Sequence, residues 1–186
     1  MSHLSKRPYL SLEMHKKLLN ALCELYNSRN TQQIVIYIVG GSALQLKYGD
    51  ELRDLTFDGD GWWIGDVDLK PYIKETAKRF HVYEDWLNDD FRGSMSFSKH
   101  IVTDAIHMTI IGLVSIFVVS DLTQLCMKLT SMRRKDSDDA IALAYKLRDA
   151  SISMVEVNTR LLQLYNGKVN INKTSLKRIE RILRRG

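Results

Sequence analysis

The stretch that decides the fold is the apolar run QIVIYIV at Gln33–Val39, which leads directly into GGSALQLKY at Gly40–Tyr48. The apolar run is short and rich in β-branched residues, which predicts a buried strand. The strand ends abruptly at the two glycines, and a short helix is expected over Ala43–Tyr48. The sequence therefore predicts a strand that turns into a helix through Gly-Gly-Ser.

Gly40, Gly41 and Ser42 are candidates for holding phosphate groups. Glycines let the backbone approach a ligand closely, and the N-terminus of a helix offers free N–H groups and a partial positive charge. The Ser42 hydroxyl is expected to donate to a phosphate oxygen. The same tripeptide occurs as often in a plain tight turn, so the turn alone does not decide between a binding site and a structural one.

A second strand is expected at Asp66–Tyr72, DVDLKPY, with Pro71 at its end. Alternation along this strand places the carboxylates of Asp66 and Asp68 on one face, about 7 Å apart. Two adjacent carboxylates repel each other unless a cation lies between them, and Mg²⁺ prefers carboxylate and phosphate oxygens. The alternative is two solvated aspartates at the start of a strand.

Strands are expected in the first two thirds of the chain and helices in the last third, which indicates the α+β class. A helix N-capped by Ser11 is expected to run to about Ser28, and two or three strands are expected over Ile101–Val119. The domain prediction is an α/β core over residues 1–120 and a helical C-terminal subdomain over residues 121–186. That subdomain is expected to hold helices from Asp121 to about Met132, from Asp136, over Ile152–Leu164 and over Thr174–Leu183.

The composition is that of a globular protein with an excess of basic residues. The chain has 186 residues, of which 45% are hydrophobic and 26% charged, with a formal net charge of +5. Cys23 and Cys126 are expected to be buried thiols. No stretch resembles a signal peptide or a membrane span, so a cytoplasmic protein that does not contact membranes is expected. Basic residues crowd the C-terminal end, which indicates either a solvated helix face or a surface for RNA.

Three segments together resemble the polymerase-beta-like nucleotidyltransferase superfamily. They are the Gly-Gly-Ser segment, the Asp-x-Asp segment at Asp66–Tyr72, and VVSDLTQLCMKLTSMRRKDSDDAIAL at Val118–Leu143. The last is similar to a helical segment of bacterial nucleotidyltransferases from toxin–antitoxin and abortive-infection loci. DWLNDDF at Asp85–Phe91 also resembles a linker in a related branch. The resemblance covers roughly Val35–Asp139.

The resemblance implies a nucleotidyltransferase-like mixed sheet flanked by helices, with Mg²⁺ as cofactor and an NTP as substrate. It implies that Asp66 and Asp68 bind the metal and act in catalysis. Lys128 and Asp136 match a catalytic lysine and acid, and Asp139 matches a second acid. Taken without the resemblance, Lys128 and Asp136 read as a surface lysine and a helix cap.

The sequence departs from the pattern of the related toxins, in which an Arg is closely followed by Ser/Thr-x-Asp-Ile-Asp. Arg53 is expected to bind the nucleotide, but Arg53 and Thr56 are separated from Asp66 by the insertion LTFDGDGWWIG. Asp58 and Asp60 in this insertion form a second Asp-x-Asp pair. We rank it below the first, because Gly-rich sequence surrounds it.

Two further features of the sequence leave alternatives open. Trp62 and Trp63 are expected either to stack on a base or ribose, or to pin the inserted loop to the body. Active members of the superfamily add a third carboxylate, for which Asp104 is the candidate among the expected strands. A turn residue is the alternative for Asp104, and His107 on the same strands is expected to be structural.

The resulting hypothesis is transfer of a nucleotidyl group from an NTP to a hydroxyl of RNA or protein. The resemblance implies tRNA as an acceptor and a cognate toxin or antitoxin as a partner, within a toxin–antitoxin or phage-defence system. A second hypothesis is a catalytically degenerate binding module of the same fold, or an antitoxin partner. A third is a nucleic-acid binder that uses the basic C-terminal helix.

Overall fold

The structure is a computed structural model that describes residues 9–52, 55–94, 97–131 and 133–184. The chain divides into two compact units. Unit 1 comprises residues 1–89 and 107–118, and unit 2 comprises residues 90–106 and 119–186. The segment 90–106, which the sequence analysis placed in the first domain, therefore clusters with the C-terminal helices.

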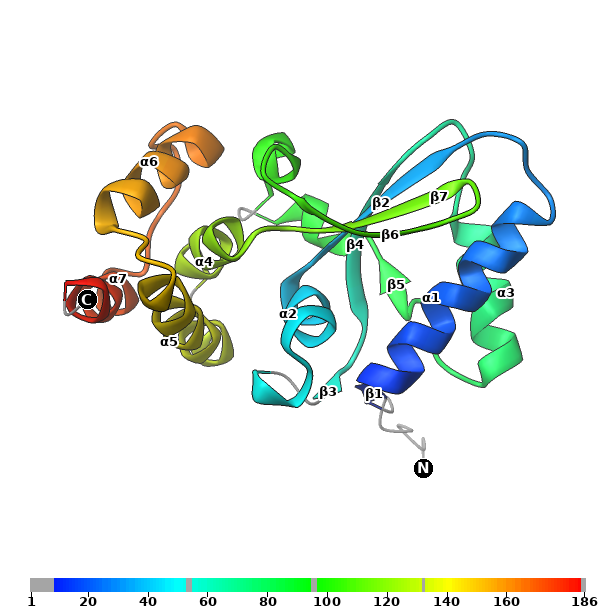
Figure 1. Cartoon of the computed structure of the whole chain (residues 1–186), viewed down its shortest axis with the longest axis horizontal. Helices are drawn as coiled ribbons and strands as arrows, with labels where there is room; N and C mark the ends of the chain where they lie inside the picture. The colour runs from blue at the N-terminus through cyan, green and yellow to red at the C-terminus, as the bar shows by residue number, and fades with distance from the viewer. Residues whose placement is uncertain (1–8, 53–54, 95–96, 132, 185–186) are drawn as a thin grey trace, which may run out of the picture. The chain divides into compact units, whose positions relative to one another are not determined.

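Unit 1 is built on a mixed five-stranded sheet with the strand order β5-β4-β2-β7-β6 (Figure 1). β2 is central; β4 runs antiparallel to it on one side, and β7 runs parallel to it on the other. A separate antiparallel pair is formed by β1 and β3. The strands are β1 (Leu10–Ser11), β2 (Ile34–Val39), β3 (Leu55–Thr56), β4 (Gly59–Ile64), β5 (Leu87–Asn88), β6 (Ile106–Ile111) and β7 (Val114–Val118).

The two faces of the sheet have different environments, which follow from the alternation of side chains along each strand. Ile34, Ile36 and Ile38 of β2 are at most 1% exposed and form the core face. Ile36 pairs with Ile116 of β7, and α1 packs against this strand. The opposite face, which carries Tyr37, is half-buried.

The described residues of unit 1 form three α-helices. Ser11 caps the first of them by accepting a hydrogen bond from the backbone N–H of Met14 at 3.3 Å. The second helix begins directly at the Gly-Gly-Ser turn, and the third packs against the first. The helices are α1 (Leu12–Asn27), α2 (Gly40–Tyr48) and α3 (Lys70–Phe80).

Unit 2 holds four α-helices among its described residues. Ser120 caps the first of these, and Ser153 with Glu156 forms a capping box at the third. α4 packs against α5 and α6, and α5 packs against α7. The helices are α4 (Asp121–Leu129), α5 (Arg134–Asp149), α6 (Met154–Tyr165) and α7 (Lys173–Leu183).

The mixture of helices with a mixed sheet is compatible with the α+β class, and both cysteines are buried thiols as expected. The strand expected at Asp66–Tyr72 is wrong. The antiparallel partner of β2 is β4, which lies within the segment LTFDGDGWWIG that was treated as an inserted loop. Pro71 does not end a strand but lies in the first turn of α3, where a missing N–H costs little.

Candidate functional site

The Gly-Gly-Ser turn lies where β2 ends and α2 begins. Gly40 is the first residue of α2 and has a backbone φ of +65°, which favours glycine. The residue that precedes it, Val39, supplies no side-chain hydrogen bond to cap the helix. The backbone N–H groups of the first turn give this end of α2 a partial positive charge.

Asp60 lies directly against this turn, because β4 runs antiparallel to β2 and pairs Asp60 with Val39. A Cβ atom added to Gly40 would lie less than 3.0 Å from Asp60 Oδ2, closer than real Cβ atoms come to such a group. The carboxylate thus occupies the space that a side chain on Gly40 would need. A negative charge at this end of α2 is favoured by the helix dipole.

Asp58 is attached to the same turn by hydrogen bonds to its carbonyl oxygen. Ser42 Oγ donates to it at 2.8 Å, and Thr56 Oγ1 donates to it at 2.9 Å. Ser42 is 1% exposed. The Ser42 hydroxyl, predicted to donate to a phosphate, joins the Gly-Gly-Ser turn to the segment carrying Asp58 in this structure.

β5 supplies a further side chain to this site. Asn88 pairs with Asp60 in the parallel ladder, and its Nδ2 donates to Asp58 Oδ2 at 3.3 Å. Between the two aspartates, Gly59 is buried, and a Cβ there would lie 3.2 Å from both His15 Nε2 and the Trp86 carbonyl oxygen. Sequence reasoning missed Asn88, although its segment DWLNDDF was noted for its resemblance.

Asp66 and Asp68 lie at the other end of the sheet from Gly40. They follow β4 in the connection to α3, and both are exposed. The Oδ1 atom of Asp68 accepts a hydrogen bond from the backbone N–H of Lys70 at 3.1 Å, at the start of α3. The length of β2, about 16 Å, separates this end of the sheet from the Gly-Gly-Ser turn. The structure does not bring the predicted metal pair to the predicted phosphate site. Instead, the Asp60 carboxylate lies against Gly40, and the Asp58 carbonyl oxygen is bonded to Ser42.

A signal in the sequence could have identified the second pair. Thr56, Asp58 and Asp60 follow one another as Thr-x-Asp-x-Asp, the succession expected after the Arg of the related toxins. Arg53 stands three residues before Thr56 but lies outside the described residues. If Asp58 and Asp60 are the aspartates of this motif, they follow Thr56 closely, and no insertion lies between Thr56 and the aspartates.

Lys128 and Asp136, the predicted lysine and acid of the distant motif, do contact each other in unit 2. Lys128 Nζ donates to Asp136 Oδ1, and it lies 2.8 Å from Asp139 Oδ2. The side chains are 8%, 1% and 10% exposed, respectively. Burial by itself raises the pKa of Asp136. The Lys128 charge and hydrogen bonds from Lys128, Ser131 and Arg133 outweigh it and lower that pKa to about 2.

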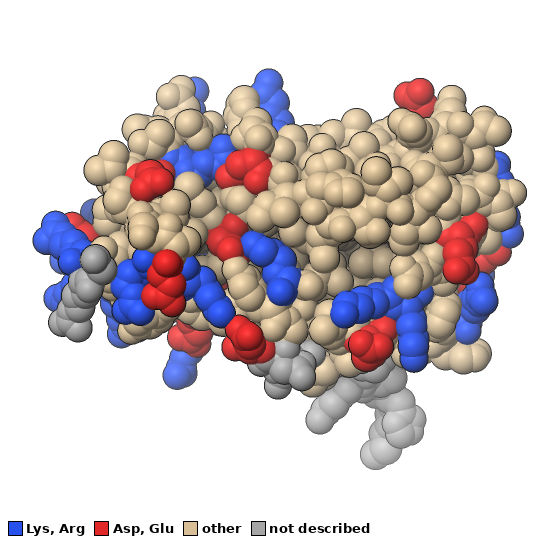
Figure 2. All heavy atoms as spheres, viewed as in Figure 1, with Lys and Arg blue, Asp and Glu red and all other residues tan. Residues whose placement is uncertain are grey.

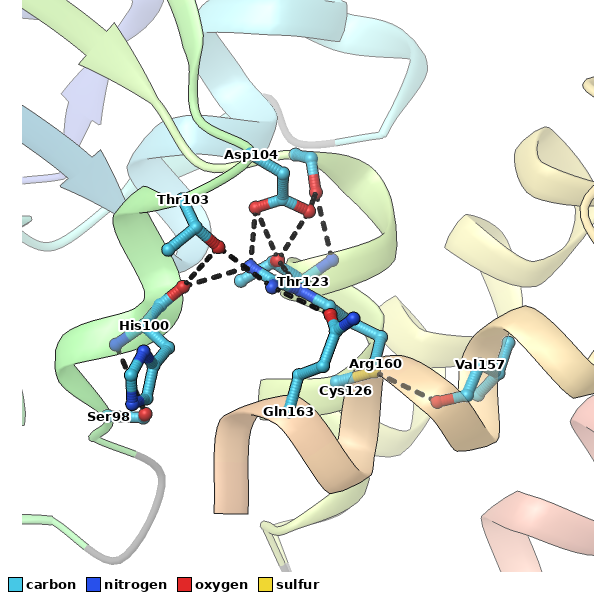
Figure 3. A network of polar contacts seen from close by, with 10 residues as sticks. Ser98, His100, Thr103, Asp104, Thr123, Cys126, Val157, Arg160 and Gln163 are labelled. Carbon is cyan, nitrogen blue, oxygen red and sulfur yellow. Dashed lines mark hydrogen bonds and ion pairs between the residues drawn. The ribbon is translucent and has the colours of Figure 1, made fainter. Parts of the chain in front are cut away.

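Asp104, the candidate for a third carboxylate, belongs to a polar network within unit 2 (Figure 3). Its oxygens accept hydrogen bonds from Ser120 Oγ at 2.5 Å, Thr123 Oγ1 at 2.8 Å and Arg160 Nη2 at 2.6 Å. Arg160 is 5% exposed and also donates to the His100 carbonyl oxygen. These contacts give Asp104 a structural role. β7, the parallel neighbour of β2, has the sequence VSIFV and carries no acid.

Aromatic side chains share the half-buried face of the sheet with Asp60. Alternation along β4 places Trp62 on this face, and its ring centroid lies 6.1 Å from that of Tyr37. The Tyr37 ring lies 5.4 Å from Phe117, which in turn contacts His107 at 5.1 Å. Trp62 is part of a strand rather than of an inserted loop, so the expectation that it pins such a loop is wrong.

A buried histidine lies beneath the site. His15 of α1 is fully buried, and its Nδ1 lies 3.0 Å from Oε1 of Gln45 on α2. The Gln45 amide nitrogen donates to the Leu10 carbonyl oxygen, so Oε1 is the acceptor and His15 Nδ1 carries the proton. Nε2 makes no hydrogen bond within the described part of the chain. Burial lowers the pKa of His15, and the hydrogen bond to Gln45 opposes this effect only in part.

Stability is therefore expected to fall on mild acidification. The unfolded chain binds a proton at His15 near pH 6.5, whereas the folded chain does so only at lower pH. The contribution of neutral His15 to the free energy of unfolding is fully present above about pH 6.5. It is lost as the pH falls below that value, at up to about 1.4 kcal/mol per pH unit. Urea unfolding from pH 8 to pH 5 measures this slope. His15→Gln should reduce the slope, and His107→Gln at an exposed histidine should leave it unchanged.

Comparison of the chain with protein-family models, with curated proteins and with solved structures finds no match. Within the described ranges, no helix is both long and apolar enough to cross a membrane. Among the same residues, no group of three or more His, Cys, Asp and Glu side chains is placed to hold a metal ion. Asp60 is the acidic side chain that lies against Gly40, and the neighbouring Asp58 carboxylate accepts from Asn88.

Proposed function

We propose that unit 1 binds a magnesium–nucleotide complex at the start of α2 and acts as a nucleotidyltransferase. The observation that carries the proposal is the position of the Asp60 carboxylate against Gly40, the first residue of α2. Relative to the sequence prediction, the metal-binding role moves from Asp66 and Asp68 to Asp58 and Asp60. The proposed nucleotide contact at Gly40 and Gly41 is unchanged.

The carboxylates of Asp58 and Asp60 are suitable ligands for the Mg²⁺ ion that the proposal requires. Asp58 and Asp60 offer carboxylate oxygens, which Mg²⁺ prefers together with phosphate oxygens. Bound there, Mg²⁺ would supply positive charge to the phosphates of the nucleotide. Asn88 holds Asp58 through its carboxylate, and Ser42 holds it through its carbonyl oxygen. The chain's own residues thus keep the pair in one geometry before any ligand arrives.

The remaining parts of the substrate have candidate contacts in the same unit. The backbone N–H groups at Gly40 and Gly41 would bind phosphate oxygens. Trp62 shares a sheet face with Asp60 and would stack on the base or ribose. In the reaction, an acceptor hydroxyl of RNA or protein attacks the α-phosphorus and loses its proton to water. The bond from that phosphorus to the leaving pyrophosphate breaks.

A second candidate is a nucleotide-binding module without catalysis, acting through a partner protein such as a toxin or antitoxin. Two observations favour it. β7 carries no acid, and Asp104 is engaged by Ser120, Thr123 and Arg160. A third carboxylate would act as the base or as a second metal ligand. Without it, binding can persist while transfer is lost.

The test compares two matched double variants. Asp58→Asn/Asp60→Asn changes the pair at the start of α2, and Asp66→Asn/Asp68→Asn removes the same charge at the other end of β4. Titration calorimetry with Mg–ATP, Mg–GTP, Mg–CTP and Mg–UTP should show binding by the wild type and by the second variant. The first variant should bind at least about 100-fold more weakly, because the metal ligands are lost.

Transfer is then measured with labelled NTP and total tRNA in the same samples. Label on RNA or on the protein, lost in Asp58→Asn/Asp60→Asn, supports the transferase. Binding without transfer supports the non-catalytic module. Equal loss of binding in both double variants, or no binding by the wild type to any of the four nucleotides, overturns the proposed site.

A further inference from the structure

The positive charge of the chain is concentrated in unit 2. This unit carries 16 Lys and Arg residues against nine Asp and Glu, a formal charge of +7. Unit 1 carries 11 against 13, a formal charge of −2, and the two add to the +5 of the whole chain. A partner attracted by charge would therefore be drawn to unit 2.

Several acids of unit 2 are already occupied by internal contacts. Asp136 and Asp139 contact the buried Lys128, and Asp104 contacts the buried Arg160. Three of the nine acids of unit 2 are therefore ion-paired with one of two buried cations, Lys128 or Arg160. Two further acids are bound close to their neighbours: Glu180 pairs with Arg184, and Glu156 caps its own helix. The cations on the surface of the unit are offset by fewer acids than the formal charge indicates.

α7 separates its apolar and basic residues on opposite sides. Ser175, Ile179 and Leu183 recur at a spacing of four and are buried against unit 2. Lys173, Lys177 and Arg181 also recur at a spacing of four and are exposed. At 100° per residue the two rows point in nearly opposite directions. Neither Lys177 nor Arg181 makes an ion pair within the described part of the chain, and the same holds for the exposed Arg178.

Exposed basic residues also stand at the start of α5, whose first turn lies close to that of α7. Ser137 and Ser175 lie 2.8 Å apart, which brings the first turns of the two helices together. Arg134 and Lys135 at the start of α5 are exposed. Figure 2 shows Lys and Arg side chains, with Asp and Glu side chains among them, over the region where α5 and α7 lie in Figure 1. We call this region the basic surface; it consists of Arg134, Lys135, Lys173, Lys177, Arg178 and Arg181.

We propose that the basic surface binds the phosphodiester backbone of a nucleic acid. The row from Lys173 to Arg181 is about 12 Å long, which suits several successive phosphates rather than one. Guanidinium groups such as those of Arg178 and Arg181 match phosphate oxygens in geometry. A membrane surface fits less well, because the apolar side of α7 is buried in the protein and is not available for insertion. This inference does not depend on the proposed function of unit 1.

The test is fluorescence anisotropy with a labelled 20-nucleotide single-stranded RNA and with a DNA duplex of the same sequence, from 50 to 200 mM salt. The variant Lys177→Gln/Arg178→Gln/Arg181→Gln should bind at least about tenfold more weakly than the wild type at 50 mM salt. The slope of log K against log salt for the single strand should shrink by about 2, since each lost contact contributes about 0.7. The two probes show whether RNA or DNA is preferred.

Three controls decide the outcome. Lys74→Gln/Lys78→Gln/Arg79→Gln removes the same charge from exposed positions of α3 and should leave affinity within about twofold. Asp58→Asn/Asp60→Asn should bind nucleic acid like the wild type, which separates this inference from the nucleotide site. Sedimentation with vesicles of 30% anionic lipid completes the set. The proposal is overturned if the wild type binds neither probe at 50 mM salt, if both triple variants lose affinity equally, or if vesicles bind where nucleic acid does not.

Discussion

Lys128→Met is expected to lower the free energy of unfolding by about 3–5 kcal/mol. Lys128 contacts both Asp136 and Asp139, and all three side chains are buried. Removing the lysine leaves two carboxylates in the interior without the charge that offsets their desolvation. Urea unfolding at pH 7 measures the effect. Lys177→Met, at an exposed position of α7, should change stability by less than about 0.5 kcal/mol.

The pH dependence of this difference gives a second measurement. The lowered pKa of Asp136 means that its contribution is present above about pH 4 and is lost as the pH falls toward 2. In Lys128→Met the main cause of that lowering is absent, and Asp136 protonates more readily than in the wild type. The stability difference between wild type and variant should therefore shrink as the pH falls below 4. A difference that is constant from pH 7 to pH 3 contradicts this account of the cluster.

The same variant separates two roles for Lys128. The resemblance to toxin-family nucleotidyltransferases implies that Lys128 and Asp136 act on the nucleotide. If Lys128 serves only to balance the charge of two buried acids, Lys128→Met should leave the affinity for Mg–ATP unchanged. The affinity is measured at a temperature where the variant is folded. A loss of affinity under those conditions supports the catalytic role.

Local patterns in the sequence were sufficient for most of the secondary structure. The run of β-branched residues before Gly40 does form the central strand, and the N-capping Ser11 does begin α1. These predictions succeed because each depends on residues within one or two turns of each other. The helices after Asp121 were likewise found from their apolar spacing, with boundaries that differ by a few residues.

The choice between the two Asp-x-Asp pairs could not be made from such patterns. Asp58 and Asp60 stand at the start of β4, and Asp66 and Asp68 follow its end. Which pair meets the Gly-Gly-Ser turn depends on the direction in which β4 pairs with β2, a long-range property. An antiparallel return places the start of β4 beside the end of β2. The glycines around Asp60 were taken as a sign of a loop, whereas Gly59 and Gly61 are needed where Leu87 packs closely against β4.

Gly40→Ala is expected to cost about 2–5 kcal/mol of stability, from two sources. The positive φ of Gly40 costs an alanine about 1–2 kcal/mol. The new Cβ must also displace the Asp60 carboxylate, an overpacking cost of about 1–3 kcal/mol. Gly167→Ala is the matched control, because Gly167 has a φ of +71° and no atom within 4 Å of its added Cβ. Gly167→Ala should show the backbone cost alone.

The double variant Gly40→Ala/Asp60→Ala isolates the contact between the two positions. Because the carboxylate that blocks the new Cβ is removed, the double variant should be less destabilised than the sum of the two single changes, by about 1–3 kcal/mol. Urea unfolding of all four proteins gives this coupling. Additive effects would mean that Asp60 does not lie against the turn, and the proposed nucleotide site would lose the observation on which it rests. A measured coupling, together with loss of Mg–ATP binding in Gly40→Ala, would tie the same atoms to both stability and ligand binding.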